Sequence, residues 1–499
     1  MTKALLVYPR FSLTFWLYRG LLKFVGKKGA FPPAGLISVA GILPELWQKK
    51  LVDMNVEELT DKDIKWANYV FVSAMTTQLE STKEVISRCK TLGVPVIMGG
   101  PIFELGPERF PDVAHCFIGE AEYTLLEFLD DLEHGRAKRI YCATEFPDIS
   151  RSPAPLWKGL VDPNNYASWL ISFCRGCPHS CTFCNIATLN GKMPRTKTID
   201  QILAELNHLY EAGFRGAVIF ADDNFIGNKR AAKKLVEVLV VWQKERGYPF
   251  EFSAEVSVVL ADDPDLMDTM VRACFKNVFL GLETPNNACL EECKKAQNTK
   301  RDMRIVVREM QRHGLRPMSG FIVGFDNDDP ANFDQMMIEF IQGTGIVVAM
   351  VGVLQAQQGS ALYQAMGKQG RLLGDASGNN LDCCPNFRPK MPVEQLVGGY
   401  KRIMRTIYSP RKYFERICIF LERCNASKRP KRKLSLVGVQ TFFRSVWWIG
   451  ILGGPVVSYY YWRTLAFALL KNPWTFPDAV TLQIYGVHFR QIVKGIMRS

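Results

Sequence analysis

Three cysteines, Cys177, Cys181 and Cys184, stand in a CxxxCxxC pattern that could hold a metal cluster. Three thiolates from one loop can ligate three irons of a 4Fe–4S cube, which leaves the fourth iron open for a substrate or cofactor. A zinc site would favour CxxC pairs that close a tetrahedron of four protein ligands. The remaining alternative is a chance grouping among the 14 cysteines of the chain. The spacing favours the cluster, and Cys174 is expected to be a bystander because the other three complete the pattern.

The elements around this loop alternate between strand and helix patterns. The expected strands are Trp169–Phe173, Ala217–Ala221, Phe250–Glu255, Asn277–Glu283, Met318–Phe325 and Val347–Gln355. Amphipathic stretches that are typical of helices separate them, as at 199–212, 229–246 and 301–312. Six such units are too few for a complete eight-stranded barrel.

Polar residues or glycines stand at the carboxyl ends of these strands, where barrels place their active sites. Asp222 closes the second strand, and Glu255 and Glu283 close the third and fourth. Gly320 and Gly324 lie in the fifth. Each motif alone is a weak signal, and either glutamate could instead cap a following helix.

Residues 1–145 also alternate strands and helices, which indicates a parallel, doubly wound sheet. Such sheets bind ligands at the carboxyl ends of their strands. Polar or glycine-rich residues follow four of the expected strands, and turn formation alone is the alternative explanation for the glycines. The candidate binding residues are Asp53, Asn55, Ser73, Thr76, Gly99, Gly100, Gly119 and Glu120.

Residues 146–165 are rich in Pro, Asp and Ser and are expected to be a linker. The strand–helix pattern then covers 166–360, and a helical, basic region covers 361–499. From 381 to 499 there are 20 Lys or Arg and 5 Asp or Glu, a net +15 against +13 for the whole chain. The positive charge is therefore concentrated in the tail, with a dense run at Lys428–Lys433.

Ser445–Trp462 is 18 residues long and carries no charge. This length just suffices to cross a bilayer, but Gly453-Gly454-Pro455 would break a helix at its middle. We expect a segment at a membrane interface or in an apolar cleft rather than a span, and a buried helical hairpin is the alternative.

The bulk composition suits an ordinary globular protein, at 47% hydrophobic and 22% charged residues. The 14 cysteines lack the spacing of a disulfide framework, and the first residues run straight into a strand-like segment without a secretory signal. We therefore expect a cytoplasmic protein, peripheral on the inner face of the membrane.

The cysteine loop and the strand-end motifs resemble those of the radical S-adenosylmethionine (SAM) enzymes. The resemblance implies an open, partial (βα)6 barrel, with SAM bound to the open iron and cleaved to methionine and a 5′-deoxyadenosyl radical. Phe183, before the last cysteine, matches the aromatic that packs near the adenine in that family. Asp222, Glu255, Glu283, Gly320 and Gly324 become SAM-binding candidates.

The N-terminal region resembles the cobalamin-binding domain fused to one branch of this family. The usual DxHxxG signature is replaced by Asp53-Met-Asn55-Val-Glu-Glu58, so the His position is Asn and the Gly position is Glu. Fused enzymes commonly lack that His, and the resemblance implies cobalt without an imidazole below it. The eight candidate binding residues above would then contact cobalamin.

Nearly the whole chain resembles the branch with a helical C-terminal extension, which includes hopanoid methylases and tetraether-lipid ring synthases. The segments that carry this resemblance are Val52–Asn55, Phe220–Asn228, Gly281–Pro285 and Asn386–Pro389. One departure, Gln355-Ala-Gln-Gln-Gly359, where many relatives read Ala-Leu-Pro-Gly or similar, puts the substrate edge of the barrel in doubt.

The favoured hypothesis is a cobalamin-dependent radical methylase of a lipid-like substrate such as a hopanoid. Its expected partners are a reducing flavodoxin or ferredoxin and an anionic membrane surface, which the basic tail would contact. Two alternatives are radical cyclisation or rearrangement of a lipid without methyl transfer, and modification of a nucleic acid. No RNA-binding module is visible, and the tail's aromatic residues are not interleaved with its basic run. An electron-transfer protein without catalysis would need the cluster but not the barrel.

Overall fold

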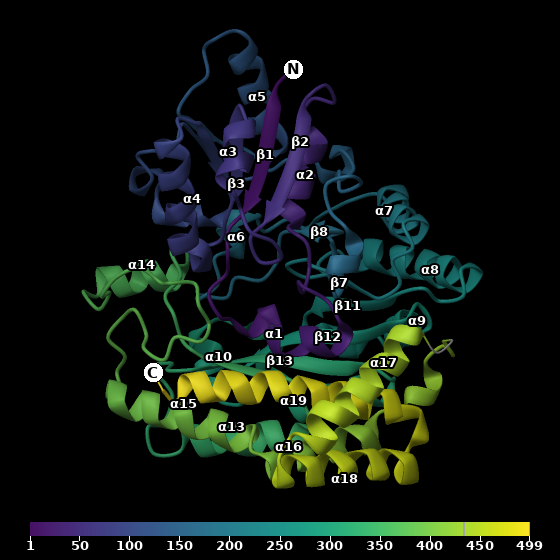
Figure 1. Ribbon diagram of the computed structural model, residues 1–499. Helices are drawn as coiled ribbons and strands as arrows, with labels where there is room; N and C mark the ends of the chain where they lie inside the picture. The colour runs from purple at the N-terminus through teal and green to yellow at the C-terminus, as the bar shows by residue number, and fades with distance from the viewer. Residues whose placement is uncertain (433–434, 499) are drawn as a thin grey trace.

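The structure is a computed structural model that describes residues 1–432 and 435–498. Six parallel strands form the first sheet, in the order β2-β1-β3-β4-β5-β6 (Figure 1). They are β1 Lys3–Tyr8, β2 Gln48–Asp53, β3 Tyr69–Ser73, β4 Val96–Gly99, β5 His115–Ile118 and β6 Ile140–Cys142. Helices α2 (Ala34–Ile42) and α5 (Ala121–Glu133) cover one face, and α3 (Asp61–Trp66) and α4 (Leu79–Thr91) cover the other. The doubly wound sheet predicted from the sequence is confirmed, with β6 as a strand that the sequence did not indicate.

A second parallel sheet of six strands has the order β14-β13-β12-β11-β10-β7 and does not close. Its strands are β7 Ser168–Ile171, β10 Ala217–Phe220, β11 Glu251–Val256, β12 Phe275–Glu283, β13 Arg316–Val323 and β14 Ala349–Val353. The helices between and after them are α7 Ile199–Glu211, α8 Lys229–Glu245, α9 Pro264–Arg272, α10 Asn287–Glu292, α11 Ala296–Thr299, α12 Met303–Arg312, α13 Phe333–Thr344 and α14 Ala361–Lys368. Local sequence sets their starts, as at α7, where Thr198 and Gln201 form a capping box. The partial (βα)6 barrel is confirmed.

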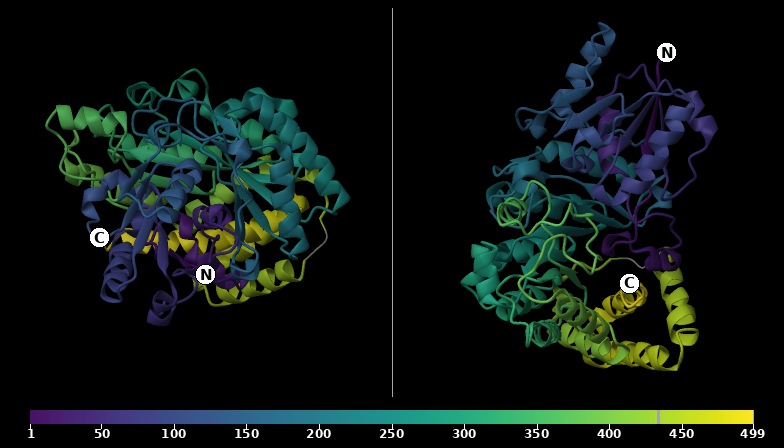
Figure 2. Two further views of the ribbon diagram at one scale, coloured as in Figure 1. Left: turned by 90° about the horizontal axis from the view of Figure 1, so that it is seen from above. Right: turned by 90° about the vertical axis from the view of Figure 1, so that its left-hand side faces the viewer.

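The C-terminal region is helical, as predicted, and lies at the end of the molecule far from the first sheet (Figures 1 and 2). Its helices are α15 Val393–Ile407, α16 Pro410–Arg423, α17 Leu436–Ser445, α18 Pro455–Lys471 and α19 Phe476–Ile496. It covers the edge strand β14, where the Tyr408 hydroxyl donates to the Ala349 carbonyl at 2.7 Å. The guanidinium of Arg416, which is fully buried, donates to the Val347 carbonyl at 3.1 Å. An edge that could otherwise pair with another chain is thereby covered.

The segment between β1 and α2 leaves the first domain and reaches the C-terminal helices. Its helix α1 (Arg19–Val25) lies beside α17 and α19 (Figure 1). The Phe15 carbonyl lies 2.9 Å from Nε2 of His488 on α19. The ring of Trp16 packs on Phe279 of β12, with 4.9 Å between ring centroids. We call residues 9–28 the strap, because they tie the two ends of the chain across the barrel.

A buried charge cluster anchors α19 under the barrel. The carboxylate of Asp478 lies 3.0 Å from Arg316 Nη1 at the start of β13 and 3.4 Å from Lys276 Nζ on β12. Arg429 Nη1 reaches its other oxygen at 2.5 Å. Burial would raise the pKa of Asp478, but the three cations outweigh it and hold the pKa well below its usual range. Two buried charges, Asp478 and Arg316, and two partly buried ones, Lys276 and Arg429, thus lie together, which is stable only while each keeps its partners.

Replacing Asp478 with Ala should destabilise the protein by about 3–5 kcal/mol, because it leaves buried cations without a counter-charge. Urea unfolding measures this, with Asp112→Asn as control, since Asp112 pairs with Lys90 in solvent and its loss costs under about 1 kcal/mol. Because the folded pKa is depressed, the contribution of Asp478 is complete above pH of about 4 and is lost as pH falls. The variant should therefore lose less stability than the wild type below that pH. Equal losses in D478A and D112N would contradict this account.

Candidate active site

The three cysteines lie on one loop that opens from a short antiparallel pair, β8 (Cys174–Arg175) and β9 (Arg195–Thr196). All three are partly exposed, whereas Cys174 is buried. Gly176 begins the loop with φ +93, and a Cβ there would lie 2.8 Å from the Met193 carbonyl oxygen. Only glycine fits that close approach without strain, so the sharp start of the loop depends on it.

Two carboxylates at the end of β10 hold this loop from beneath. One oxygen of Asp222 accepts from the backbone N–H groups of Phe173 at 2.7 Å and Cys174 at 2.9 Å. Asp223 accepts from the backbone N–H of Gly176 at 2.7 Å. Asp222 is buried, which raises its pKa to about 7. Asp222, a SAM-binding candidate in the sequence, is thus placed under the loop, where it supports the backbone around the cysteines.

The thiols of Cys177, Cys181 and Cys184 lie close enough to influence one another. Burial raises the pKa of each, that of Cys184 to about 11; the Cys181 thiol raises the pKa of Cys177 and Cys184 further, and Glu283 raises that of Cys181. Lys295 lowers all three. Among the described residues no three His, Cys, Asp or Glu side chains converge on one ion position. A cube needs no such convergence because each cysteine ligates a different iron, so the loop fits a cluster.

A cleft of about 220 Å³ lies at the carboxyl ends of β12, β13 and β14. Three SAM-binding candidates line it, Phe183, Glu283 and Gly320. Other lining residues are mostly apolar and include Phe15, Trp16, Phe279, Phe321, Ile322 and Met350. The strap therefore supplies two aromatic walls of the cleft. No sequence pattern predicts that these residues reach the barrel.

Glu283 is held by an ion pair with Lys295 and has the left-handed backbone conformation at φ +64. Burial opposes the charge of Lys295, but Glu283 and then Cys181 outweigh it and raise the Lys295 pKa. The ammonium lies 5.9 Å from the centroid of the Phe183 ring. Lys295 thus links the cleft to the cysteine loop, and it follows α10 in a position that no sequence motif marked.

Two further SAM-binding candidates lie outside the lining of this cleft. Glu255 ends β11, where burial and then the charge of Asp223 raise its pKa to about 7. Gly324 directly follows β13, and its N–H donates to Asp328 at 2.7 Å, while a Cβ on it would lie 3.1 Å from Leu396 Cδ2. The structure therefore brings three of the six SAM-binding candidates together at one cleft.

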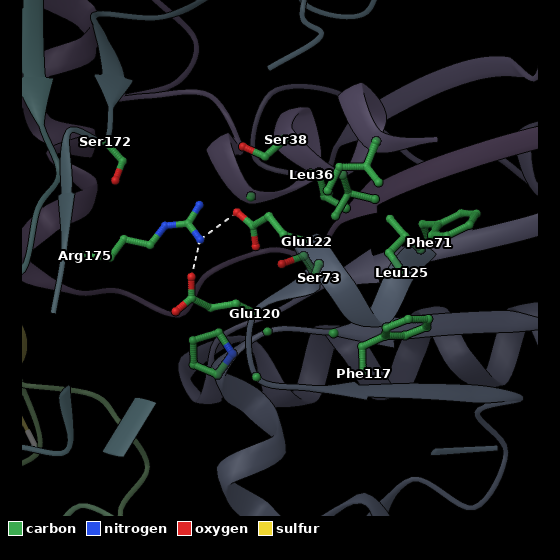
Figure 3. A pocket seen from close by; sticks show the side chains of 18 of the residues that line it. Leu36, Ser38, Phe71, Ser73, Phe117, Glu120, Glu122, Leu125, Ser172 and Arg175 are labelled. Atoms are coloured by element: carbon green, nitrogen blue, oxygen red, sulfur yellow. Dashed lines mark hydrogen bonds and ion pairs between the residues drawn. The ribbon is translucent and has the colours of Figure 1, made fainter. Parts of the chain in front are cut away.

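A larger cavity of about 480 Å³ lies between the two sheets, against the carboxyl ends of β3, β4 and β5 (Figure 3). Five of the eight cobalamin candidates line it, namely Ser73, Gly99, Gly100, Gly119 and Glu120. The walls on the α2 and α5 side are largely apolar, with Leu36, Phe71, Phe117 and Leu125. A Cβ on Gly100 would approach the Ala74 carbonyl oxygen to 2.7 Å. No lining residue is a histidine.

The other three cobalamin candidates lie away from this cavity. Asp53 accepts from the Tyr166 hydroxyl at 3.0 Å and from Asn55 Nδ2 at 2.8 Å. The Asn55 Oδ1 accepts from the backbone N–H of Phe11 at 3.0 Å. Thr76 packs near Gly378. Asp53 and Asn55, the remnant of the DxHxxG signature, therefore fasten β2 to the strap and to Tyr166.

Arg175 joins the two domains across the cavity, as Figure 3 shows. Its Nη1 lies 2.5 Å from Glu120 and 2.7 Å from Glu122. Arg195 of β9 lies 2.5 Å from the other oxygen of Glu120. Burial would lower the Arg175 pKa, but Glu122 and Glu120 outweigh it and raise the pKa. Neither arginine was predicted as a site residue from the sequence. Arg175 could have been noticed as the one charge between an apolar run and the cysteines.

A neighbouring cavity of about 370 Å³ shares Gly100, Gly119 and Glu120 with the larger one. It extends to Asn185 and Thr188, just after the third cysteine, on and before α6 (Ile186–Leu189). The glycine edge of the first sheet therefore lines both cavities. The larger cavity reaches Cys174 and Arg175, just before the cluster cysteines, and the smaller one reaches Asn185, just after them.

Three families match consecutive parts of the chain. Residues 27–129 match the B12 binding domain, and residues 171–339 match the radical SAM superfamily. Residues 360–499 match a family described as a domain of unknown function, DUF4070. These matches follow the two sheets and the C-terminal helices in order.

Two curated relatives align over nearly the whole chain. An uncharacterized methyltransferase of Synechocystis sp. is 39% identical, over 99% of this chain and 92% of the relative. A hopanoid C-2 methylase of Rhodopseudomonas palustris is 30% identical, over 92% of this chain and 88% of the relative. The chain is thus similar throughout to two methyltransferases.

Two solved structures share the fold at low identity. The radical SAM methyltransferase TsrM from Kitasatospora setae, with cobalamin and a 4Fe–4S cluster bound, has a TM-score of 0.60 at 15% identity, over 76% of this chain and 77% of that one. The cobalamin-dependent SAM radical enzyme OxsB, with aqua-cobalamin and SAM bound, has a TM-score of 0.64 at 12% identity, over 100% of this chain and 80% of that one. The predicted cofactors, a 4Fe–4S cluster, SAM and cobalamin, are confirmed by these families and relatives. The chain is an enzyme and belongs to the cobalamin-dependent radical SAM methyltransferases.

Proposed function

We propose that the enzyme methylates an unactivated carbon of a lipid-like substrate such as a hopanoid. The observation that carries this proposal is a pair of cavities that share the glycine edge of the first sheet and reach the residues just before and just after the cluster cysteines. When bound there, the cluster supplies an electron for SAM cleavage and cobalamin supplies a methyl group. The protein's part is to hold both groups against one substrate and to keep water out.

For the cluster we propose Cys177, Cys181 and Cys184 as ligands, with Asp222 and Asp223 positioning their loop. For SAM we propose contacts from Phe183, Glu283 and Gly320, which line one cleft. The ammonium of Lys295 fixes the Glu283 carboxylate and balances negative charge near Cys181. Glu255 and Gly324 are assigned supporting positions at the ends of β11 and β13.

For cobalamin we propose Ser73, Gly99, Gly100, Gly119 and Glu120, because these residues line the larger cavity. Three glycines at the strand ends allow a flat group to approach the backbone closely. No histidine lines the cavity, and Asn55 is engaged elsewhere. The lower face of cobalt would therefore receive no protein imidazole.

Two observations support a lipid-like substrate. The cleft that we propose for SAM has further walls of Phe15, Trp16, Phe279 and Met350, which favour an apolar substrate bound next to SAM. The hopanoid methylase relative covers 92% of this chain, C-terminal helices included. A low-potential flavodoxin or ferredoxin would deliver the electron, and the anionic inner face of the membrane would present the lipid.

Replacing Cys177, Cys181 and Cys184 together with Ala should remove the cluster, which has about four irons. Iron analysis after anaerobic reconstitution should fall to background, and 5′-deoxyadenosine should no longer form. C174A is the matched control and should keep both, since Cys174 contacts Asp222 through its backbone N–H. SAM cleavage by the triple variant would refute the ligand assignment.

Anaerobic holoenzyme reduced to the cobalt(II) state should show no imidazole nitrogen splitting in its electron paramagnetic resonance spectrum. N55H should show none either, because the position faces Phe11 and Asp53 rather than the cavity. Nitrogen splitting in the wild type, or its gain in N55H, would place cobalt elsewhere than we propose.

Lipid profiling of a deletion strain tests the reaction itself. One methylated lipid class should disappear and should return with the wild-type gene but not with C181A. Methyl-labelled SAM should place its label in that lipid. A lost lipid that differs by ring closure instead of a methyl group, or label found in RNA, would reject the proposed methylation of a lipid.

A further inference from the structure

Fourteen large apolar side chains between Leu436 and Trp474 are exposed, each by 38% or more. They are Leu436, Val437, Val439, Phe443, Trp447, Trp448, Ile451, Leu452, Val456, Tyr459, Trp462, Leu469, Leu470 and Trp474. Monomeric proteins rarely expose large apolar patches unless something binds there. We call this set the hairpin face, after the turn that joins α17 to α18, where the two helices meet at a steep angle (Figure 2).

The exposed residues follow one stripe of each helix. On α17 and the π-helical turn after it, Leu436, Val439, Phe443 and Trp447 recur at intervals of three or four residues. On α18 the opposite stripe is buried, with Tyr461, Leu465 and Ala468 packed inside. α18 therefore uses one face to join the protein and leaves the other uncovered, whereas residues 436–440 of α17 are exposed on every side.

Internal bonds fix the hairpin in this arrangement. The hydroxyls of Ser445 and Tyr461, both buried, lie 2.8 Å apart. The indole N–H of Trp462 donates to the Gly450 carbonyl at 3.1 Å, and the Ser458 hydroxyl donates to the Ile449 carbonyl at 2.9 Å. The apolar stripes are thus presented by a packed structure. Ser445–Trp462, whose placement the sequence left open, is partly buried and partly exposed.

The charges carried by the hairpin itself have one sign, whereas α16, which packs against α18, carries Glu415 and Glu422. No Asp or Glu occurs between Glu422 and Asp478. Exposed cations sit over exposed aromatics, with Lys23 of α1 at 4.4 Å from the Trp448 ring, Lys431 at 5.4 Å from Trp474 and Arg463 at 5.4 Å from Tyr459. Aromatic rings beside cations are typical of segments that lie in the headgroup region of a membrane.

The basic run Lys428–Lys433 contributes less than the sequence suggests. Lys428, Arg429 and Arg432 form ion pairs with Asp268, Asp478 and Glu251. Lys433 lies outside the described residues. Among the described residues beside the hairpin face, the exposed cations without an ion pair are therefore Lys23, Lys431, Arg463 and Lys471.

We propose that the hairpin face docks on an anionic lipid bilayer, with its apolar stripes in the headgroup–acyl boundary. The proposed lipid substrate explains why the enzyme would dock on a membrane, so in this respect the inference rests on the proposed function. The evidence for docking is the hairpin face itself. No described helix is long and apolar enough to cross a membrane, so docking is interfacial. A second copy of the chain fits less well, because a two-fold contact would set like charges against one another.

Docking at this face also places the substrate cleft near the lipid. Lys23 belongs to α1, and the strap runs from α1 back to Trp16 and Phe15, which line the cleft. Arg444 of α17 donates to the Phe24 carbonyl at 3.1 Å, which fastens α1 to the hairpin. One continuous segment thus joins the docking face to the site.

Co-sedimentation of the anaerobically reconstituted holoenzyme with vesicles tests the docking. Vesicles of phosphatidylcholine alone are compared with equal parts phosphatidylcholine and phosphatidylglycerol, at low and high salt. The triple variant W447S/I451S/L452S, which we call the tip variant because these residues lie between α17 and α18, should lose binding to both lipids by at least tenfold. L126S/V241S/I305S is its control, since these side chains are similarly exposed but outside the hairpin face, and it should bind like the wild type.

A charge variant, K23Q/K431Q/R463Q/K471Q, should lose about fivefold per charge on anionic vesicles at low salt, since each cation near such a surface adds about that factor. Its binding to neutral vesicles should barely change. Circular dichroism and urea unfolding confirm that the variants fold. The proposal would be overturned if the wild-type protein did not bind vesicles, or if the control and the tip variant lost binding equally. It would also be overturned if the tip substitutions abolished a dimer, or if RNA and not lipid retained the protein.

Methyl transfer to lipid in detergent separates this inference from the proposed function. The tip variant should retain that transfer in detergent and lose it with vesicles. If the wild-type protein bound vesicles but methylated no lipid in detergent, the proposed substrate would be rejected and the docking surface would not.

Discussion

The structure depends on a small group of buried charges that hold the carboxyl ends of two parallel sheets face to face. Arg175 and Arg195 flank the cysteine loop, and both form ion pairs with Glu120, which lies at the edge of the first sheet. Partly buried charges are stable only in pairs with good geometry, so this clamp fixes the loop relative to the glycine edge. Asp222 and Asp223 complete the support by bonding the backbone beneath.

The same reliance on satisfied buried charges recurs away from the cavity. Lys295 lies between Glu283 and Cys181 and ties the SAM cleft to the loop. Asp478 gathers three cations and seats α19 under the barrel. The strap, held by His488, can then place Trp16 against Phe279. The C-terminal helices thus shape the cleft as well as cover an edge of the sheet.

Most of the fold could be predicted because buried parallel strands are short apolar runs with turn residues after them. The barrel strands differ from their predicted ranges by only a few residues at their ends. β6 is only three residues long and partly exposed, so its sequence has no clear strand pattern. The strap was missed because its partners, such as His488, are more than 470 positions away.

The candidate site was predictable where spacing or backbone sterics decide the residue type. The cysteine spacing and the strand-end glycines are of this kind. Asp53, Asn55 and Asp222 are polar residues at strand ends too, yet their side chains bond to backbone and to Tyr166. Arg175 and Lys295 act through partners far along the chain, and no local pattern identifies such pairs.

The central claim is that the cluster and cobalamin share one space between the two sheets. Pulsed electron paramagnetic resonance on holoenzyme with the reduced cluster and cobalt(II) measures the dipolar coupling between these two paramagnets. The account predicts strong coupling in the wild type, and a broader range of couplings in R175A, where the clamp on Glu120 is weakened. Two full-occupancy signals without mutual coupling would show that the groups are bound apart, and would contradict the account.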